Sequence, residues 1–271
     1  MAQDNDKTQK ETQIDPKAKG NGAGGVEASF PLFYKDPQPL DAERHKNYGL
    51  VENFGLGFTE GVNAVPVNLV EMPQICHHYP IAFSPDESAT PVAILGLRDN
   101  ENLFLTQDGG WTEQGYIPAY IRRYPFIFSE MQGSDQLSLC VDMDSNVVTE
   151  NDGQPFFDKE GKPTELAQNA LEFCKSYHAA AQQTIEFSKK LMEHDLLIER
   201  QAEINLYDNR RINFSGFRII DEEKLGKLDD KVFLDFRQKG WLPYIYAHLF
   251  SGTQWQHLTR LLNTELQKDA A

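Results

Sequence analysis

The feature that most constrains the fold of this chain is a long stretch in which apolar residues recur at helical spacing. Between residues 166 and 192 the apolar side chains are separated mostly by intervals of three or four. That period places them on one face of an α-helix. Pro163 and Thr164 precede the stretch and suit the start of a helix. The pattern predicts a helix of about 28 residues, ~42 Å long, with one face buried against the rest of the protein.

The first half of the chain has a different pattern. Short apolar stretches separated by turn residues predict strands. Residues 103–111 predict a hairpin, because Asp and Gly readily adopt the positive φ of a tight turn. Residues 69–78 predict a short helix. The strands are expected at residues 50–58, where glycines bend the strand, and at 81–83, 92–97, 102–106, 126–128 and 137–141.

The remainder of the second half combines a polar, strand-like region at residues 197–220 with helical segments. Asp221 is expected to cap a short helix, Pro243 suits the first turn of another, and a last helix contains Trp255 and Leu258. Strands followed by helices, without alternation, favour the α+β class. We therefore expect mostly short antiparallel strands in the first half, and the long amphipathic helix and C-terminal helices in the second.

The N-terminal 29 residues differ in composition from everything after them. They are rich in Gln, Asn, Asp, Lys and Gly, and carry too few apolar side chains to offset the entropy of ordering. We expect residues 1–29 to be a disordered polar tail and residues 30–267 to form one globular domain. The tail carries four Lys against five acidic residues, so a net charge of −14 out of −15 belongs to the folded body.

This acidity limits the partners. The chain has 26 basic and 41 acidic residues, and a body of that charge repels nucleic acid and anionic membranes. No stretch approaches the roughly 18 apolar residues of a membrane span, so we expect no membrane insertion. The three cysteines lack CxxC spacing and are expected to be reduced thiols. Without a secretory signal at the N-terminus, we expect a soluble protein of the cytoplasm.

One cluster holds possible metal ligands. Glu71, His77 and His78, with Cys76 between them, offer a carboxylate, two imidazoles and a thiol. Their spacing matches no known zinc pattern, and the favoured alternative is a buried Cys beside two partly exposed imidazoles. No Gly-rich phosphate loop or Gly-x-Ser-x-Gly elbow is present in the sequence, and proximity of His248 to Ser251 is generic for a helix. We accordingly expect no cofactor.

A second candidate is a ligand-binding site at Arg122, Arg123 and Tyr124, with Trp111 nearby in the sequence. Paired guanidiniums can hold a carboxylate or phosphate, so an anionic ligand or a peptide C-terminus would suit them. The favoured alternative is structural, with the arginines bridging internal carboxylates such as Asp142 or Asp144. The neighbouring aromatic residues have the same double interpretation, as a groove or as core, and core is favoured.

Several motifs resemble those of the SapC family of bacterial proteins, and together they cover nearly everything after the tail. They are His78-Tyr-Pro-Ile-Ala-Phe83, Val92-Ala-Ile-Leu-Gly-Leu97, Asn102-Leu-Phe, Gly110-Trp111, Gly115-Tyr-Ile-Pro-Ala-Tyr-Ile-Arg-Arg-Tyr-Pro-Phe126, Leu139-Cys-Val-Asp142, Phe156-Phe-Asp-Lys-Glu-Gly161, Gly240-Trp-Leu and His248-Leu-Phe-Ser251. The resemblance implies a link to a bacterial surface layer, for which the family is named, and the peptidase label of some members.

The same resemblance implies genomic neighbours: flavin-dependent tryptophan-halogenase-like proteins, cupin-like proteins and TonB-dependent outer-membrane receptors. These genomic neighbours imply a role in nutrient uptake at the cell surface. The resemblance assigns no catalytic residue. It also does not extend to the peptide-transport permease that shares the short name, because that protein has spanning segments.

The function expected from these observations is that of a non-catalytic accessory or binding protein, associated with cell-surface or nutrient-uptake systems. Its partner would be a protein, a small molecule or a peptide. The alternative is an enzyme, metal-dependent or hydrolytic and peptidase-like, whose groups converge only in the fold. A true surface-layer component is a third possibility, which requires export to the cell surface by a non-classical route. The oligomeric state stays open.

Overall fold

The computed structural model describes residues 30–112, 115–130, 137–207 and 210–269. The predicted disordered tail, residues 1–29, lies outside the described residues. Within them the strands form three antiparallel sheets, ordered β1-β7-β6, β8-β2-β9 and β10-β11-β4-β5-β3. The class is therefore α+β, as predicted. The strands are β1 (Pro37–Pro39), β2 (Tyr48–Leu50), β3 (Ala64–Pro66), β4 (Ile81–Phe83), β5 (Pro91–Ile94), β6 (Phe126–Glu130), β7 (Leu137–Asp142), β8 (Val148–Glu150), β9 (Gln154–Pro155), β10 (Leu197–Asn205) and β11 (Arg211–Ile220).

Helices lie between and after these strands. Two 3₁₀ turns come first, η1 (Gly57–Thr59) and η2 (Leu69–Glu71). The α-helices are α1 (Met72–Ile75), α2 (Ala119–Arg122), α3 (Glu165–Glu193), α4 (Glu222–Gly226), α5 (Asp230–Gln238), α6 (Leu242–Ser251) and α7 (Gln254–Asp269). None of the helices in the described ranges is long and apolar enough to cross a membrane.

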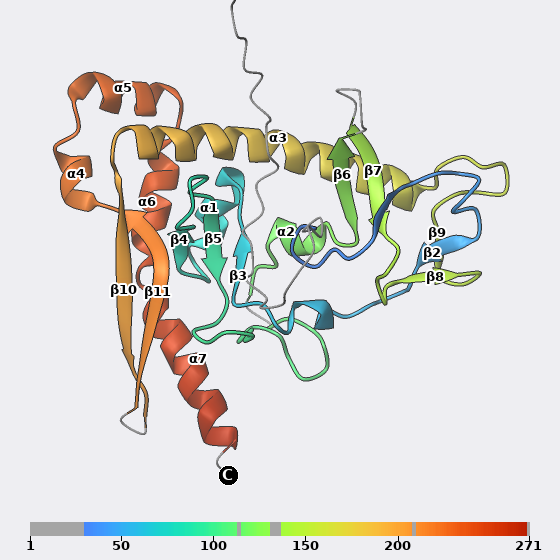
Figure 1. The fold of residues 1–271 in the computed structure, drawn as a ribbon, viewed down its shortest axis with the longest axis horizontal. Helices are drawn as coiled ribbons and strands as arrows, with labels where there is room; N and C mark the ends of the chain where they lie inside the picture. The colour runs from blue at the N-terminus through green and yellow to red at the C-terminus, as the bar shows by residue number, and fades with distance from the viewer. Residues whose placement is uncertain (1–29, 113–114, 131–136, 208–209, 270–271) are drawn as a thin grey trace, which may run out of the picture.

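The long helix α3 confirms the amphipathic pattern. It runs for 29 residues and crosses the top of the molecule in Figure 1, from β6 and β7 at one end to α5 and α6 at the other. Its N-terminal half places Cys174 in an apolar cluster with Phe126 and Phe156. Its C-terminal half places Phe187 and Leu191 in the largest core, which also contains the five-stranded sheet. One helix face is thus buried in two separate cores.

Two of the expected strands, at residues 102–106 and 50–58, are not formed as predicted. Residues 102–106 contribute only an isolated bridge between Leu105 and Trp111, although the Thr106 N–H donates to the Gly110 carbonyl at 3.0 Å and so closes the predicted hairpin. Asn102 explains why no ladder forms there. Its side-chain amide donates to the Thr59 carbonyl at 3.1 Å, and its oxygen accepts from the Phe104 N–H at 3.0 Å. These side-chain bonds hold Asn102 outside a regular ladder, while the Leu103 N–H still donates to the Leu95 carbonyl at 2.9 Å.

The segment at residues 50–58 likewise differs from the predicted bent strand. Only its first residue, Leu50, belongs to a strand, and its last two belong to η1. The Leu56 N–H donates to the Gly109 carbonyl at 2.7 Å. A Cβ on Gly55 would lie 2.9 Å from that same oxygen, so the glycine permits this close approach. The Val51 N–H donates to the Val147 carbonyl beside β8, and after that the backbone of this segment bonds to the hairpin loop and not to a sheet.

A β-bulge shapes strand β11. Arg200 pairs with Phe217 and Ala202 with Phe214, so two residues of β11, Ser215 and Gly216, face a single residue of β10. Phe214 and Phe217 would point to opposite faces of a regular strand, but the extra residue turns both to one face. Their rings lie 5.4 Å apart and pack on Trp255 of α7 at 5.6 and 5.3 Å. Gly216 adopts φ 82°, a left-handed conformation that glycine reaches at no steric cost.

Replacing Gly216 with alanine tests this bulge. We expect Gly216→Ala to lower the free energy of unfolding by about 1 to 2 kcal/mol, because a Cβ is strained at positive φ. The matched control is Gly226→Ala in α4, where an added Cβ meets nothing within 4 Å. Alanine favours a helix by up to about 1 kcal/mol, so that variant should be neutral or more stable. Urea unfolding of both variants measures the difference, and equal stabilities would contradict the bulge geometry.

Candidate functional site

The predicted metal ligands do not converge. Glu71 is buried and points inward, His77 is exposed, and His78 has its Nε2 3.4 Å from the side-chain nitrogen of Gln74. In the part of the chain that the structure describes, no three His, Cys, Asp or Glu residues are placed to hold a metal ion. The structure therefore gives Glu71, His77 and His78 no common site. The alternative expectation, a buried Cys76 beside two more exposed imidazoles, describes the observed arrangement.

Glu71, itself buried, instead anchors a polar cluster with Tyr116, Ala119 and the exposed Arg122, here called the Glu71 cluster. Its Oε1 accepts the Ala119 N–H at 2.7 Å and the Tyr116 hydroxyl at 2.8 Å, and lies 3.7 Å from an Arg122 nitrogen. Burial and the Glu71 charge raise the pKa of Tyr116 to about 12, so its hydroxyl stays protonated and donates. These bonds fix the segment that carries α2 onto η2.

Trp111 belongs to the same network. Its indole N–H donates to the Tyr79 hydroxyl at 2.8 Å, and that hydroxyl donates to the Tyr116 carbonyl at 2.5 Å. Burial raises the pKa of Tyr79. The indole ring also stacks on Phe104, with ring centroids 6.1 Å apart. A side chain that the sequence offered as a ligand contact thus joins the core to the Glu71 cluster.

The two adjacent arginines point to different partners. Arg122 donates to the Tyr116 hydroxyl at 2.8 Å and approaches the Glu71 carboxylate. Arg123 lies between the rings of Tyr120 and Tyr177, 4.4 Å from each centroid. The structure therefore does not bring the pair together as a fork for one anion. Arg122 meets an internal carboxylate as the structural alternative expects, but this carboxylate is neither Asp142 nor Asp144.

Tyr124 and Asp142 form a separate buried pair. The Tyr124 hydroxyl donates to Asp142 Oδ2 at 3.1 Å, and Asp142 Oδ1 accepts the backbone N–H groups of Lys35 and Asp36. Burial, followed by the Asp142 charge, raises the pKa of Tyr124. The carboxylate thus ties the start of the described chain to β7. Tyr124 thus has a structural role in this pair.

Removing the Glu71 carboxylate tests the cluster. We expect Glu71→Ala to lower the free energy of unfolding by about 3 kcal/mol, because the Ala119 N–H, the Tyr116 hydroxyl and Arg122 lose their acceptor together. The control is Glu87→Ala, whose exposed side chain should change stability by less than about 0.5 kcal/mol. Urea unfolding compares them. Similar losses for both variants would mean that the cluster adds no stability.

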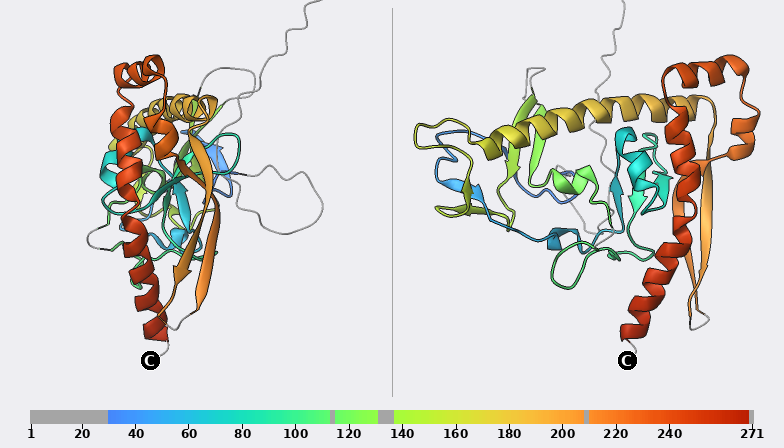
Figure 2. Two further views of the ribbon diagram at one scale, coloured as in Figure 1. Left: turned by 90° about the vertical axis from the view of Figure 1, so that its left-hand side faces the viewer. Right: turned by 180° about the vertical axis from the view of Figure 1, so that it is seen from behind.

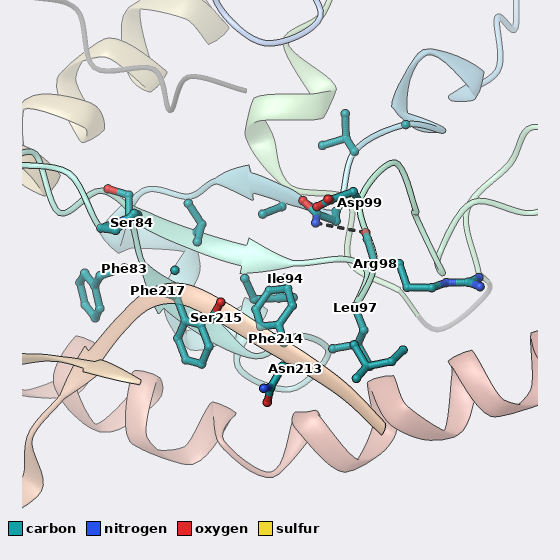
Figure 3. Close-up of a pocket in the computed structure, with 18 of the residues that line it drawn as sticks. Phe83, Ser84, Ile94, Leu97, Arg98, Asp99, Asn213, Phe214, Ser215 and Phe217 are labelled. Atoms are coloured by element: carbon teal, nitrogen blue, oxygen red, sulfur yellow. Dashed lines mark hydrogen bonds between the residues drawn. The ribbon is translucent and has the colours of Figure 1, made fainter. Parts of the chain in front are cut away.

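The structure shows a cleft that sequence reasoning missed. We call it the β11 cleft; its volume is about 830 Å³, and residues 210–217 line one side of it without interruption. Figure 3 shows Phe214, Ser215 and Phe217 along β11, with Ile94 on the sheet beside them. Ala64 and Ile94 are paired across β3 and β5, so they present one apolar face to the cleft.

A tight loop carries charge to the rim of the cleft. The Glu101 carboxylate accepts the backbone N–H groups of Leu97 and Arg98 at 3.0 and 3.1 Å. It also holds the Arg98 guanidinium, with a nitrogen at 2.5 Å. A Cβ on Gly96 would lie 2.3 Å from the Glu101 carbonyl oxygen, so only glycine permits this approach. Asn63 donates to the Arg98 carbonyl at 3.2 Å, the bond drawn in Figure 3.

The charges lining the β11 cleft differ in sign from the chain as a whole. Its lining contains three arginines, Arg98, Arg210 and Arg211, and one acidic residue, Asp99. Arg98 and Arg211 have acidic neighbours, Glu101 and Glu203, yet their side chains are 43% and 68% exposed. A guanidinium has five N–H donors, so each can still donate to a carboxylate that enters the cleft.

One signal in the sequence could have indicated this cleft. Phe214-Ser-Gly-Phe217 interrupts a strand-like region with glycine between two aromatic residues. An isolated glycine within a strand often marks a bulge, and bulges are frequent beside binding sites. The sequence does not show which distant residues complete the cleft.

Comparison with known proteins adds a family. The family model of SapC matches residues 40–258. The chain belongs to the SapC family. Neither the curated proteins nor the solved structures gave a significant match. The SapC region contains the Glu71 cluster and all of the cleft lining except Leu32 and Leu266.

The SapC region also contains the histidine and serine that lie three residues apart. His248 is buried, and its Nε2 accepts the Ile220 N–H at 3.1 Å. The Ser251 hydroxyl donates to the His248 carbonyl at 2.6 Å and accepts the Ile81 N–H at 2.9 Å. The two side chains therefore join α6 to the central sheet and do not form a nucleophile and base.

The cysteines of this SapC protein are buried and free. Burial raises the pKa of Cys76, and raises those of Cys140 and Cys174 to about 11. A thiolate is the reactive form of cysteine, and a higher pKa leaves less of it at neutral pH. None of the three thiols is thus prepared for nucleophilic attack.

His248 makes the stability of the protein depend on pH. Burial lowers its pKa to about 4, below the ordinary value of 6.5, so the unfolded state binds a proton more readily. The contribution of the neutral His248 to the free energy of unfolding is fully present above pH 6.5 and is lost as the pH falls toward 4. We expect wild type to lose about 3 kcal/mol more than His248→Gln over this range. Urea unfolding at pH 7 and pH 4 measures the loss.

The glutamine oxygen can still accept the Ile220 N–H, but it does not titrate. His77→Gln removes an exposed imidazole and serves as the control, which should retain the pH dependence of wild type. A His248→Gln variant with unchanged pH dependence would show that the buried imidazole is not responsible.

Proposed function

We propose that this SapC protein is a non-catalytic binding protein and that the β11 cleft is its ligand site. The observation that carries the proposal is the cleft itself, which combines an apolar floor with arginines at its rim. Its volume of about 830 Å³ falls within the range of ordinary ligand sites. The bulge at Gly216 supports the proposal, because it turns Phe214 and Phe217 to the same face of β11, beside the cleft.

The alternative, an enzyme whose groups assemble in the fold, has less support. Arg122 does meet Glu71, but two hydrogen bonds and the guanidinium already occupy the Glu71 carboxylate. The raised pKa values of the cysteine thiols disfavour nucleophilic attack. His78 lies against Gln74, and His77 is exposed. The arrangement favours binding over catalysis.

The cellular setting belongs to the same proposal. Membership of the SapC family supports a role beside cell-surface or nutrient-uptake systems. We place the protein in the cytoplasm, with non-classical export to the cell surface as the alternative. Fractionation of native cells tests this location. Recovery of the chain in the surface fraction would replace the cytoplasmic assignment.

Blocking the cleft tests the binding role. We expect full-length protein purified from its native host to retain a small molecule or peptide that native mass spectrometry detects. Ser215→Trp should lose that species, because Ser215 is exposed within the cleft and a large ring there fills its volume. The fold should tolerate the change, since an exposed position needs little repacking.

The matched control is Gln201→Trp, which places the same ring on the exposed β10 residue opposite the bulge. This residue does not line the cleft, so the variant should retain the ligand. Retention by Ser215→Trp at the wild-type level would contradict the cleft as the binding site. Wild type without any retained species would contradict the binding role.

A further inference from the structure

The edge of β11 points to a more specific ligand. We propose that the β11 cleft binds an extended peptide segment with acidic side chains, which adds to the sheet as a strand along β11. This inference rests on the proposed binding function and narrows its ligand class.

The backbone of β11 is paired on one edge and largely open on the other. Its β10 side carries the ladder from Leu197–Ile220 to Asn205–Arg211. On its β4 side, the pairing between described residues consists of Arg218 with Phe83. Successive N–H and C=O groups of a strand alternate between its two edges. Residues 211–217 therefore direct unpaired backbone groups away from β10, over a length of about 23 Å.

That open edge faces the cleft. Side chains alternate between the two faces of a strand, so a cavity against one face touches every second residue. The β11 cleft instead touches eight residues in succession, from Arg210 to Phe217. A cavity that touches consecutive residues of a strand lies along the edge of that strand. A strand edge that borders a cleft is the structural element to which extended peptides add in β-augmentation.

The floor and the rim define the chemistry of the segment. Phe214 and Ala64, both partly exposed, provide an apolar surface for alternate side chains of an added strand, and the buried Phe217 and Ile94 also line the cleft. The lining carries three arginines and one aspartate, within a chain whose net charge is −15. Carboxylates are the groups that exposed guanidiniums bind best among peptide side chains. The charge complement of the cleft is therefore an acidic peptide.

Fluorescence anisotropy with the full-length protein tests this inference. The probe is a labelled pool of octapeptides with glutamate at alternate positions and valine, isoleucine, phenylalanine or threonine between them. We expect saturable binding, and at least tenfold weaker binding of a pool in which lysine replaces glutamate. Arg211→Gln should weaken binding of the acidic pool about tenfold through loss of a charge-assisted bond. The control is Arg200→Gln, at an exposed β10 position outside the cleft, which should leave binding of the acidic pool unchanged.

Backbone methylation tests strand addition separately from charge. One acidic pool is N-methylated at the glutamates and another at the residues between them. Since the two sets of N–H groups point to opposite edges of the peptide, we expect one methylated pool to lose binding and the other to keep it. Hydrogen exchange of wild type with the unmethylated pool should show new protection within residues 211–217.

The outcomes separate this inference from the proposed function. Equal binding of the acidic and lysine pools, equal effects of the two methylations, or no peptide binding would each overturn the acidic peptide. If Ser215→Trp still loses the ligand retained from the host, the β11 cleft remains the ligand site and only the ligand class is wrong. If Ser215→Trp keeps that ligand, both proposals fail.

Discussion

The burial of one face of α3 in two apolar cores is the interaction on which the rest of the structure depends. Phe187 and Leu191 pack in the core of the five-stranded sheet, while Cys174 packs beside Phe126 and Phe156. In a protein, tertiary packing of the apolar face of a helix supplies most of the stability of that helix. In return the helix holds the sheets in one arrangement, which Figure 2 shows from two further sides.

Buried polar interactions complete this arrangement. They also involve the residues that the sequence suggested as functional. Thr184 of α3 accepts the Leu69 N–H at 3.0 Å, which docks η2 on the helix. Glu71 of η2 then binds the backbone and side chains around α2. An unsatisfied buried carboxylate is costly, so such a group recruits every donor within reach. Charged residues that are prominent in the sequence thereby become structural, and the open cleft forms elsewhere.

Local patterns were sufficient to predict much of the fold. The period of α3, the Asp221 cap and the hairpin that ends at Trp111 depend on neighbouring residues. The strand expected at 102–106 failed because Asn102 bonds to Thr59, which lies 43 residues away in the chain. The candidate site was harder to predict. Glu71 and Arg122 were both selected from the sequence, but their contact with each other depends on the packing of α2 against η2.

By itself the sequence determined the α+β class, the long helix, the acidic charge and the resemblance to SapC, because each is a property of composition or of short-range spacing. Only the tertiary structure decided which polar side chains make structural contacts and where a cleft stays open. The β11 cleft joins Ala64 and Ile94 to Phe214 and Ser215, which are more than 100 residues apart in sequence. Such a surface exists only after long-range packing has brought distant strands together, and no local pattern encodes that convergence.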